Sequence, residues 1–366
     1  MPLQHIDPAN YEAQLANKVS EFKTAFAPFG LPEPEIHRSA LLNYRMRAEF
    51  RMFHLNGRVD YAMFAAHSPK RPVVIKDYPL GSKTLVDLMP RLLERLQASD
   101  VLRNALYQTE FLTTLSGQAM VTLVYRRPLS DAWEAEARQL AGDLGIQIVG
   151  RSRGRKHVLE RDWLLESFEL NGRNLHYQQV EASFTQPNGE VNRQMLAWAC
   201  AQANGLGGDL LELYCGNGNF TIALAPLFKR VLATEVSKSS VKAAEYNLAA
   251  NQLDNVAVVR LSSEELSSAM AGTETFTRLQ HIDLKDYRFS TIFVDPPRAG
   301  LDDGTLALAA GFDHILYISC NPQTLLENVT ALNSTHEIAA SAVFDQFPYT
   351  HHLEAGLLLR KRQPAA

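Results

Sequence analysis

Cysteine is scarce in this chain of 366 residues, which contains three: Cys200, Cys215 and Cys320. None of them forms a Cys-x-x-Cys pair, so the sequence predicts no metal site of the zinc type and no iron–sulfur cluster. A small, odd number of cysteines fits a reducing compartment and leaves one thiol available for chemistry.

Long apolar runs are also missing. No run approaches the roughly 18 residues that a membrane-spanning helix needs, although hydrophobic residues make up 46% of the chain. Residues 1–20 lack the continuous apolar core of a signal peptide. We therefore expect a cytoplasmic globular protein without a membrane partner.

The chain has no overall excess of positive charge, because its net charge is −4. The charge is uneven, however. Residues 38–127 hold 14 basic and 7 acidic side chains, and a second basic run follows at residues 151–157. Since a phosphate backbone responds to local charge, the first half of the chain has the composition of a nucleic-acid-binding surface.

Length and periodicity predict two domains after a helical N-terminal segment, residues 1–37. Apolar side chains recur at helical spacing over residues 10–28. Over residues 44–53 the period becomes two, and Asn56-Gly57 then predicts a hairpin. We expect residues 38–170 to form an RNA-binding α+β domain that contains an antiparallel sheet, with helices near 82–98 and 130–143.

After about residue 170, short apolar strands alternate with helices. This pattern is typical of an α/β domain with a parallel, doubly wound sheet. We expect a Rossmann-like domain over residues 171–366. Its predicted strands cover residues 210–214, 230–235, 255–260, 291–295 and 314–319.

A Gly-rich turn follows the first of these strands, in Tyr214-Cys-Gly-Asn-Gly-Asn219. Its glycines permit a tight turn at the carboxyl end of a strand, where open α/β sheets bind ligands. Glu235 ends the next strand, where a carboxylate accepts both ribose hydroxyls of an adenosine. The third glycine of the dinucleotide fingerprint is absent. The turn therefore favours S-adenosyl-L-methionine over an NAD-type cofactor, and a turn without a ligand is the other alternative.

Two further strand ends carry the residues suited to chemistry, in Asp295-Pro-Pro-Arg298 and in Ser319-Cys-Asn-Pro322. Both ends should lie beside the Gly-rich turn. A buried packing role is usual for cysteine, and we expect it for Cys200 and Cys215. Cys320, at the carboxyl end of a strand, is predicted to be a nucleophile. Addition of its thiolate to C6 of uracil would make C5 reactive toward a methyl group. Nearby Arg298 is a hypothetical stabiliser of that thiolate.

This reaction also needs a base that removes the C5 proton. The segment 347–354 offers His351, His352 and Glu354, and spacing alone does not decide among them.

These motifs resemble the RNA 5-methyluridine methyltransferase family, in its branch of bacterial tRNA (uracil-5-)-methyltransferases that act on the T-loop uridine. The residues that carry the resemblance lie at 44–51, 183–188, 211–220, 293–298, 317–322 and 344–352. The absence of four N-terminal cysteines favours this tRNA branch over the related enzymes of ribosomal RNA.

The resemblance implies S-adenosyl-L-methionine as methyl donor, Cys320 as nucleophile and Glu354 as proton acceptor. It also implies that five residues bind the donor: Gln186, Tyr214, Asn219, Glu235 and Asp295. The implied partner is the T-arm of tRNA, with tmRNA as a second substrate, and no protein partner is predicted.

The RNA itself must be held while a stacked uridine is extruded. Candidates for phosphate contact are Arg45, Arg47, Arg51 and the run 151–156, and candidates for stacking are Tyr107, Phe111 and Tyr125. Two other functions compete: methylation of an exocyclic amine, in which Cys320 would have no role, and an RNA-folding protein without required catalysis.

Overall fold

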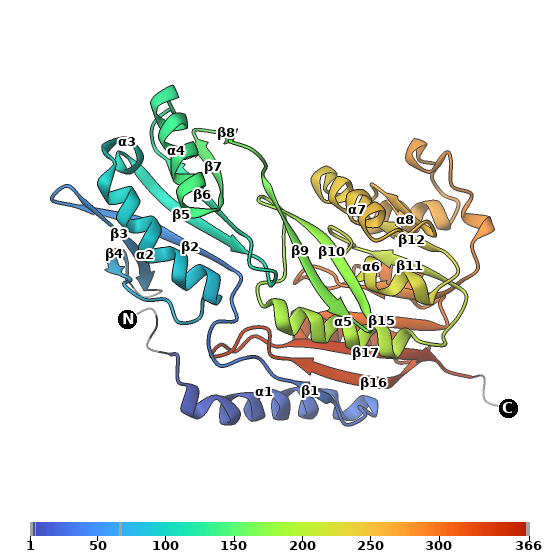
Figure 1. Ribbon diagram of the computed structural model, residues 1–366. Coiled ribbons are helices and arrows are strands. Elements are labelled where there is room, and N and C mark those ends of the chain that lie inside the picture. The colour runs from blue at the N-terminus through green and yellow to red at the C-terminus, as the bar shows by residue number, and fades with distance from the viewer. Residues whose placement is uncertain (1–2, 4, 66–67, 364–366) are drawn as a thin grey trace. The chain divides into compact units, whose positions relative to one another are not determined.

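The computed structural model describes residue 3 and residues 5–65 and 68–363. The chain forms two compact units, each shown in Figure 1. The first unit comprises Ala40–Ser167 and Gln179–Gly189 with the described residues up to Asn10, and the second comprises the rest. A two-stranded sheet of β9 (Trp163–Leu170) and β10 (Arg173–Val180) contributes residues to both units.

The first unit is built on a seven-stranded sheet of order β4-β3-β2-β5-β6-β7-β8. Every neighbouring pair is antiparallel except β6 and β7, which helix α4 connects. This confirms the mainly antiparallel α+β architecture. The strands are β2 (Arg47–Leu55), β3 (Arg58–Ala65), β4 (Ser68–Val74), β5 (Leu106–Thr113), β6 (Ala119–Tyr125), β7 (Gln147–Ser152) and β8 (Arg155–Val158), and the helices are α2 (Lys83–Ala98), α3 (Asp100–Arg103) and α4 (Asp131–Leu144).

The predicted alternation along β2 is confirmed. The side chains of its apolar face, which begins just before the strand, are all buried: Tyr44, Met46, Ala48, Phe50 and Met52. Asn56 and Gly57 have φ angles of 49° and 74°, which a two-residue hairpin turn of the primed type requires. Strand β3 therefore returns antiparallel to β2, as the hairpin prediction requires.

The second unit contains an eight-stranded sheet of order β1-β16-β17-β15-β14-β11-β12-β13. Strands β11 to β15 are parallel neighbours, whereas β17 pairs antiparallel with both β15 and β16. The Rossmann-like α/β fold is thus confirmed. The strands are β1 (Glu35–His37), β11 (Asp209–Leu213), β12 (Val231–Thr234), β13 (Val256–Val259), β14 (Phe289–Val294), β15 (His314–Ser319), β16 (His336–Phe344) and β17 (Glu354–Lys361).

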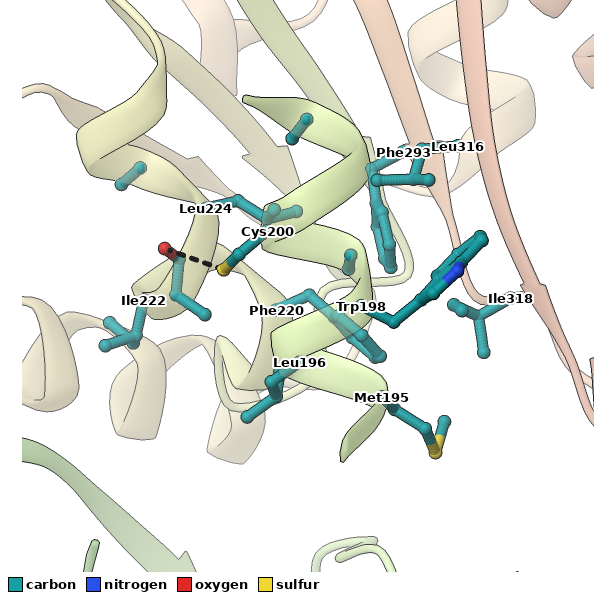
Figure 2. Packing of buried hydrophobic residues seen from close by; sticks show 14 of the residues in the cluster. Met195, Leu196, Trp198, Cys200, Phe220, Ile222, Leu224, Phe293, Leu316 and Ile318 are labelled. Atoms are coloured by element: carbon teal, nitrogen blue, oxygen red, sulfur yellow. Dashed lines mark hydrogen bonds between the residues drawn. The ribbon is translucent and has the colours of Figure 1, made fainter. Parts of the chain in front are cut away.

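Seven helices accompany this sheet in the part of the chain that the structure describes: α1 (Tyr11–Phe26), α5 (Gly189–Ala203), α6 (Asn219–Leu224), α7 (Lys238–Ala250), α8 (Ser263–Met270), α9 (Asp303–Ala309) and α10 (Pro322–Leu332). Figure 2 shows α5 packed between α6 and the sheet, with Trp198 near Ile318. Cys200 lies in this core, where its thiol donates to the carbonyl of Ala223 at 3.5 Å and burial raises its pKa to about 11. Its predicted packing role agrees with this position.

Candidate active site

The carboxyl ends of the parallel strands bring three predicted site residues side by side. The register pairs Leu213 of β11 with Val294 of β14, so the next residues along these strands are Tyr214 and Asp295. On the other side of β11, Glu212 pairs with Ala233 of β12, and the Cys215 N–H then donates to the Thr234 carbonyl at 3.0 Å, which brings the end of β11 beside Glu235. This edge is where an open α/β sheet binds its ligands.

The adjacent strands extend the same edge to the thiol and the carboxylate. Ser319 of β15 pairs with Ala355 of the antiparallel strand β17. One step further in that register Cys320 faces Glu354. Cys320 is half-buried and Glu354 is buried, with 5% of its surface exposed. The sulfur therefore lies at the open end of the sheet beside a carboxyl group that has little access to water.

Charges and burial couple these groups. Burial raises the pKa of Glu354 to about 8, and Asp295 adds to this shift while Arg298 opposes it. Burial likewise raises the pKa of Asp295 to about 7. The pKa of Cys320 is raised to about 11, first by burial and then by the carboxylates of Glu354 and Asp295. At neutral pH the free protein therefore holds a protonated thiol beside a mostly protonated Glu354.

Arg298 lowers the pKa of the Cys320 thiol and so favours the thiolate, as hypothesised. Its effect is smaller than the combined effect of burial and the two carboxylates, which raise that pKa. Its position is fixed by its backbone carbonyl, which accepts hydrogen bonds from the Asn321 amide at 2.9 Å and from the Thr324 hydroxyl at 3.2 Å. Its guanidinium lies 3.3 Å from the ring nitrogens of His352. The Asp-Pro-Pro-Arg loop is thereby joined to the loop that follows Cys320.

The cofactor half of the site is built on Glu235. Its two carboxylate oxygens accept the backbone N–H groups of Gly216, at 3.0 Å, and of Ser237, at 2.7 Å. Gly216 and Gly218 have φ angles of 57° and 83°, which explains the need for glycine in this turn. Each oxygen of Glu235 retains acceptor capacity for a hydroxyl group.

The neighbouring Val236 is an apolar side chain with 63% of its surface exposed. A fixed hydroxyl acceptor beside an exposed apolar side chain suits the ribose and the ring of an adenosine. These residues therefore fit S-adenosyl-L-methionine. Within the described ranges of the chain, no cluster of three or more His, Cys, Asp or Glu side chains could hold a metal ion.

The remaining predicted cofactor residues occupy different settings. Tyr214 adopts a left-handed backbone conformation, with φ of 60°, and its hydroxyl donates to the Ser263 hydroxyl at 2.8 Å. The side chain of Asn219 exchanges two hydrogen bonds with that of Asn192, at 3.0 and 2.9 Å. Gln186 is half-buried and belongs to the first unit, in the segment between β10 and α5. The geometry of the second unit thus gathers every predicted catalytic and cofactor residue except Gln186.

Cys215, the rival thiol, is buried with 4% exposure in the Gly-rich turn, and burial raises its pKa well above the ordinary value. It therefore packs in the wall of the turn, as the sequence indicated.

Several candidates for RNA contact have structural roles in the first unit. The Arg47 guanidinium donates to the backbone carbonyls of Ser183, at 2.7 Å, and of Glu181. Arg151 and Lys156 form ion pairs with the buried carboxylate of Glu181, at 2.6 and 3.0 Å. Because these groups already serve the fold, they are poor candidates for a phosphate clamp.

The three candidates for base stacking differ in their burial. Phe111 and Tyr125 are core residues with 1% and 3% exposure, so the interpretation of both as stacking residues was wrong. Tyr107 is half-buried and lies between the guanidinium groups of Arg51 and Arg126, at 4.1 and 4.0 Å from its ring centre. These three residues line one groove of the first unit.

Sequence reasoning missed Lys18, whose ammonium pairs with the buried Asp345 at 2.7 Å. The signal was present, since Lys18 lies on the apolar stripe of α1, between Leu15 and Phe22. A lysine on such a stripe needs a buried partner.

A family model described as tRNA (Uracil-5-)-methyltransferase matches residues 10–362. Among curated relatives, a protein of Aromatoleum aromaticum is 63% identical over 362 residues, with 99% of this chain and 98% of the relative covered. One of Dechloromonas aromatica is 64% identical, with 99% and 100% covered. Both relatives are named tRNA/tmRNA (uracil-C(5))-methyltransferase.

The fold has a solved counterpart. The structure of Pyrococcus abyssi tRNA (uracil-54, C5)-methyltransferase in complex with S-adenosyl-L-homocysteine superposes with a TM-score of 0.73 at 22% identity, over 96% of this chain and 83% of that one. At this identity the likeness bears on the fold.

Proposed function

The chain belongs to the tRNA (uracil-5-)-methyltransferase family, and we propose that it methylates C5 of the T-loop uridine, position 54, through a covalent bond between Cys320 and C6 of the base. S-adenosyl-L-methionine supplies an electrophilic methyl group. The proposal is supported by the pairing of Ser319 with Ala355, next to which Cys320 and Glu354 lie at the binding edge of the sheet, and by the effect of the Glu354 carboxylate on the pKa of Cys320.

Each step assigns one task to one side chain. The Cys320 thiolate adds to C6, and the electron pair of the C5–C6 double bond shifts toward the C4 oxygen as an enolate. C5 then takes the methyl group, and the former methyl–sulfur bond breaks. Glu354 removes the C5 proton, the double bond re-forms and the thiolate leaves. In the base, the methyl group thus replaces the proton on C5, and no other atom is gained or lost.

Glu354 suits this role better than the two histidines. It is buried opposite the sulfur, and its raised pKa of about 8 lies near an ordinary working pH. His351 is exposed, and the ring of His352 is occupied by Arg298. Burial first, then His351, Arg298 and Lys18, lower the pKa of His352.

We assign donor binding to Glu235, Tyr214, Asn219, Asp295 and Gln186. Glu235 would accept the ribose hydroxyls, because its carboxylate is held by two backbone N–H groups. Asp295 follows β14, which lies between the strands that lead to Tyr214 and to Cys320, and it would therefore contact the donor near the thiol.

The first unit is proposed to hold the T-arm. The guanidinium–tyrosine–guanidinium stack of Arg51, Tyr107 and Arg126 offers positive charge and planar guanidinium groups, on which a base can stack, in one groove. Arg45 is half-buried beside this strand and is a further candidate for phosphate contact. The names of the relatives include tmRNA, so we also propose its T-arm as a substrate. The cytoplasm is the proposed site of action, because tRNA is modified there.

One experiment tests the function. Unmodified tRNA is incubated with the protein and methyl-labelled donor, and the modified nucleoside and its position are identified. We expect 5-methyluridine at the T-loop position. Methylation of an exocyclic amine, or of a uridine outside the T-loop, would refute the proposal.

Two variants test the covalent route. Cys320→Ala should abolish methyl transfer while it leaves tRNA binding largely intact, and full turnover by this variant would exclude the thiol. Glu354→Gln should allow methyl addition and then stall, so that labelled RNA stays attached to the protein in denaturing gels. Normal turnover without an adduct would move the base to a histidine.

A further inference from the structure

The loop between β16 and β17, residues 345–353, leads directly into Glu354. The ammonium group of Lys18, on helix α1, donates to three acceptors in this loop. They are the Asp345 carboxylate at 2.7 Å, the Phe347 carbonyl at 3.2 Å and the His352 carbonyl at 3.0 Å. An ammonium group has three N–H donors, so all of them are used.

These acceptors lie at the two ends of the loop. Asp345 directly follows Phe344, which pairs with Glu354 in the β16–β17 register. His352 precedes Glu354 by two residues. One cation therefore connects the start and the end of the loop next to the carboxylate that faces Cys320.

Inside the loop, the turn is closed by short contacts. The Thr350 hydroxyl donates to the Phe347 carbonyl at 2.8 Å and accepts the His352 backbone N–H at 3.2 Å. Tyr349 has a φ of 63°, a left-handed conformation that costs energy for a residue other than glycine. The ring of Tyr11, one heptad before Lys18 on α1, meets the ring of Tyr349 edge-on at 6.1 Å.

The ion pair between Lys18 and Asp345 is buried. Lys18 is 9% exposed and Asp345 is 1% exposed. Removal of either partner leaves the other charge buried without compensation, which proteins tolerate poorly. The two carbonyl bonds have no role in neutralising charge, and they fix the direction of the backbone that enters β17.

We infer that Lys18 is a positioning residue for Glu354, and that helix α1 thereby sets the place of the group that removes the C5 proton. This inference rests on the proposed function. Helix α1 would then contribute to catalysis at the removal of the C5 proton, which follows methyl transfer.

The test compares the breakdown of the protein–RNA adduct in variants. Lys18→Met should slow product release from the adduct at least about tenfold and slow methyl addition much less, so that labelled RNA accumulates on the protein. Lys18→Arg keeps the charge and several donors and should restore most of the release rate. Lys23→Met is the matched control, because Lys23 lies on the same helix in an ion pair with Glu33 and is 44% exposed.

Two further variants distinguish a positioning role of Lys18 from a purely structural one. Val19→Ala removes a buried side chain from the same helix and should lower the melting temperature without stalling release. Lys18→Met combined with Asp345→Leu removes both charges, so it should recover much of the melting temperature while release stays slow. This double variant also keeps the test informative should Lys18→Met alone fail to fold.

Three outcomes would overturn the inference. One is wild-type release by folded Lys18→Met or by the double variant. Another is an equal stall in Val19→Ala at a matched loss of melting temperature. In the third, Glu354→Gln accumulates an adduct and no Lys18 variant does. If Glu354→Gln also forms no adduct, the proposed function itself fails.

Discussion

The coupling between Cys320 and Glu354 predicts an unusual response to Glu354→Gln, in which the sulfur becomes more reactive while turnover stops. The carboxylate of Glu354 raises the pKa of the Cys320 thiol. A neutral amide of the same shape removes that repulsion, so the thiol pKa falls and the thiolate fraction rises. Catalysis nevertheless stalls, because the amide cannot accept a proton.

The pH at which this difference appears follows from the structure. The pKa of Glu354 is raised to about 8, so below that value both proteins carry a neutral group beside the sulfur. Wild type and variant should then react alike near pH 7. Above pH 8 the wild-type carboxylate is ionised and suppresses the thiolate. With a thiol pKa of about 11, the wild-type thiolate fraction near pH 9 is about 1%.

The pKa of Cys320 is raised from 9.0 to about 11, and the Glu354 carboxylate is the second-largest cause after burial. If removal of the carboxylate lowers that pKa by about one, the thiolate fraction rises roughly tenfold. We therefore expect Glu354→Gln to be alkylated by iodoacetamide roughly ten times faster than wild type at pH 9 to 9.5. Labelling is followed by mass spectrometry of the peptide that contains Cys320. Cys200 and Cys215 are buried and should contribute little.

Two controls define the result. Cys320→Ala removes the labelled peptide, and Glu337→Gln changes an exposed carboxylate on β16 that pairs with Arg362. Equal alkylation of wild type and Glu354→Gln across the whole pH range would mean that the carboxylate does not face the sulfur. The electrostatic argument for the site would then be refuted.

Three further predictions concern RNA binding and stability. Arg51→Ala should weaken tRNA binding and lower the slope of log affinity against log salt by about 1, measured by filter binding, and an unchanged slope would remove Arg51 from the RNA surface. Arg47→Ala should instead lower the melting temperature and leave that slope unchanged, because its guanidinium serves two backbone carbonyls; a normal melting temperature with a reduced slope would contradict this. Glu212 is buried with its pKa raised to about 8, so the native state binds more protons than the unfolded chain, and stability should fall by about 1 kcal/mol between pH 7 and 8.5. Denaturant melts of Glu212→Gln should lack that part of the fall, and an identical pH dependence in both proteins would count against it.

Most of the fold was predictable because periodicity reports directly on burial. The alternation from Tyr44 to Met52 predicted which face of β2 is buried, and all five inner side chains lie in the core. The short apolar strands likewise predicted a parallel sheet. The hairpin of β9 and β10 was missed, since its strands belong to two units and neither has one clean apolar face.

The site was predictable where it depends on strand ends. Tyr214, Glu235, Asp295 and Cys320 each follow a recognisable strand, and the sheet order then sets them along one edge. Functional roles of arginine were not predictable in the same way. Arg47 and Arg51 alternate identically along β2, yet one binds backbone carbonyls and the other lies over Tyr107. That difference depends on contacts remote in sequence, as does the pair of Lys18 with Asp345.

The mutual repulsion of Cys320 and Glu354 bears on the order of the chemical steps. The thiolate forms most easily while Glu354 is protonated, whereas proton removal from C5 requires Glu354 to be ionised. Once the sulfur is bonded to C6 it is a neutral thioether and carries no negative charge that ionisation of Glu354 would oppose. In the adduct Glu354 can therefore ionise without destabilising a thiolate, at the stage where a base is needed. The charge states that the two steps require thus favour addition first and proton removal second.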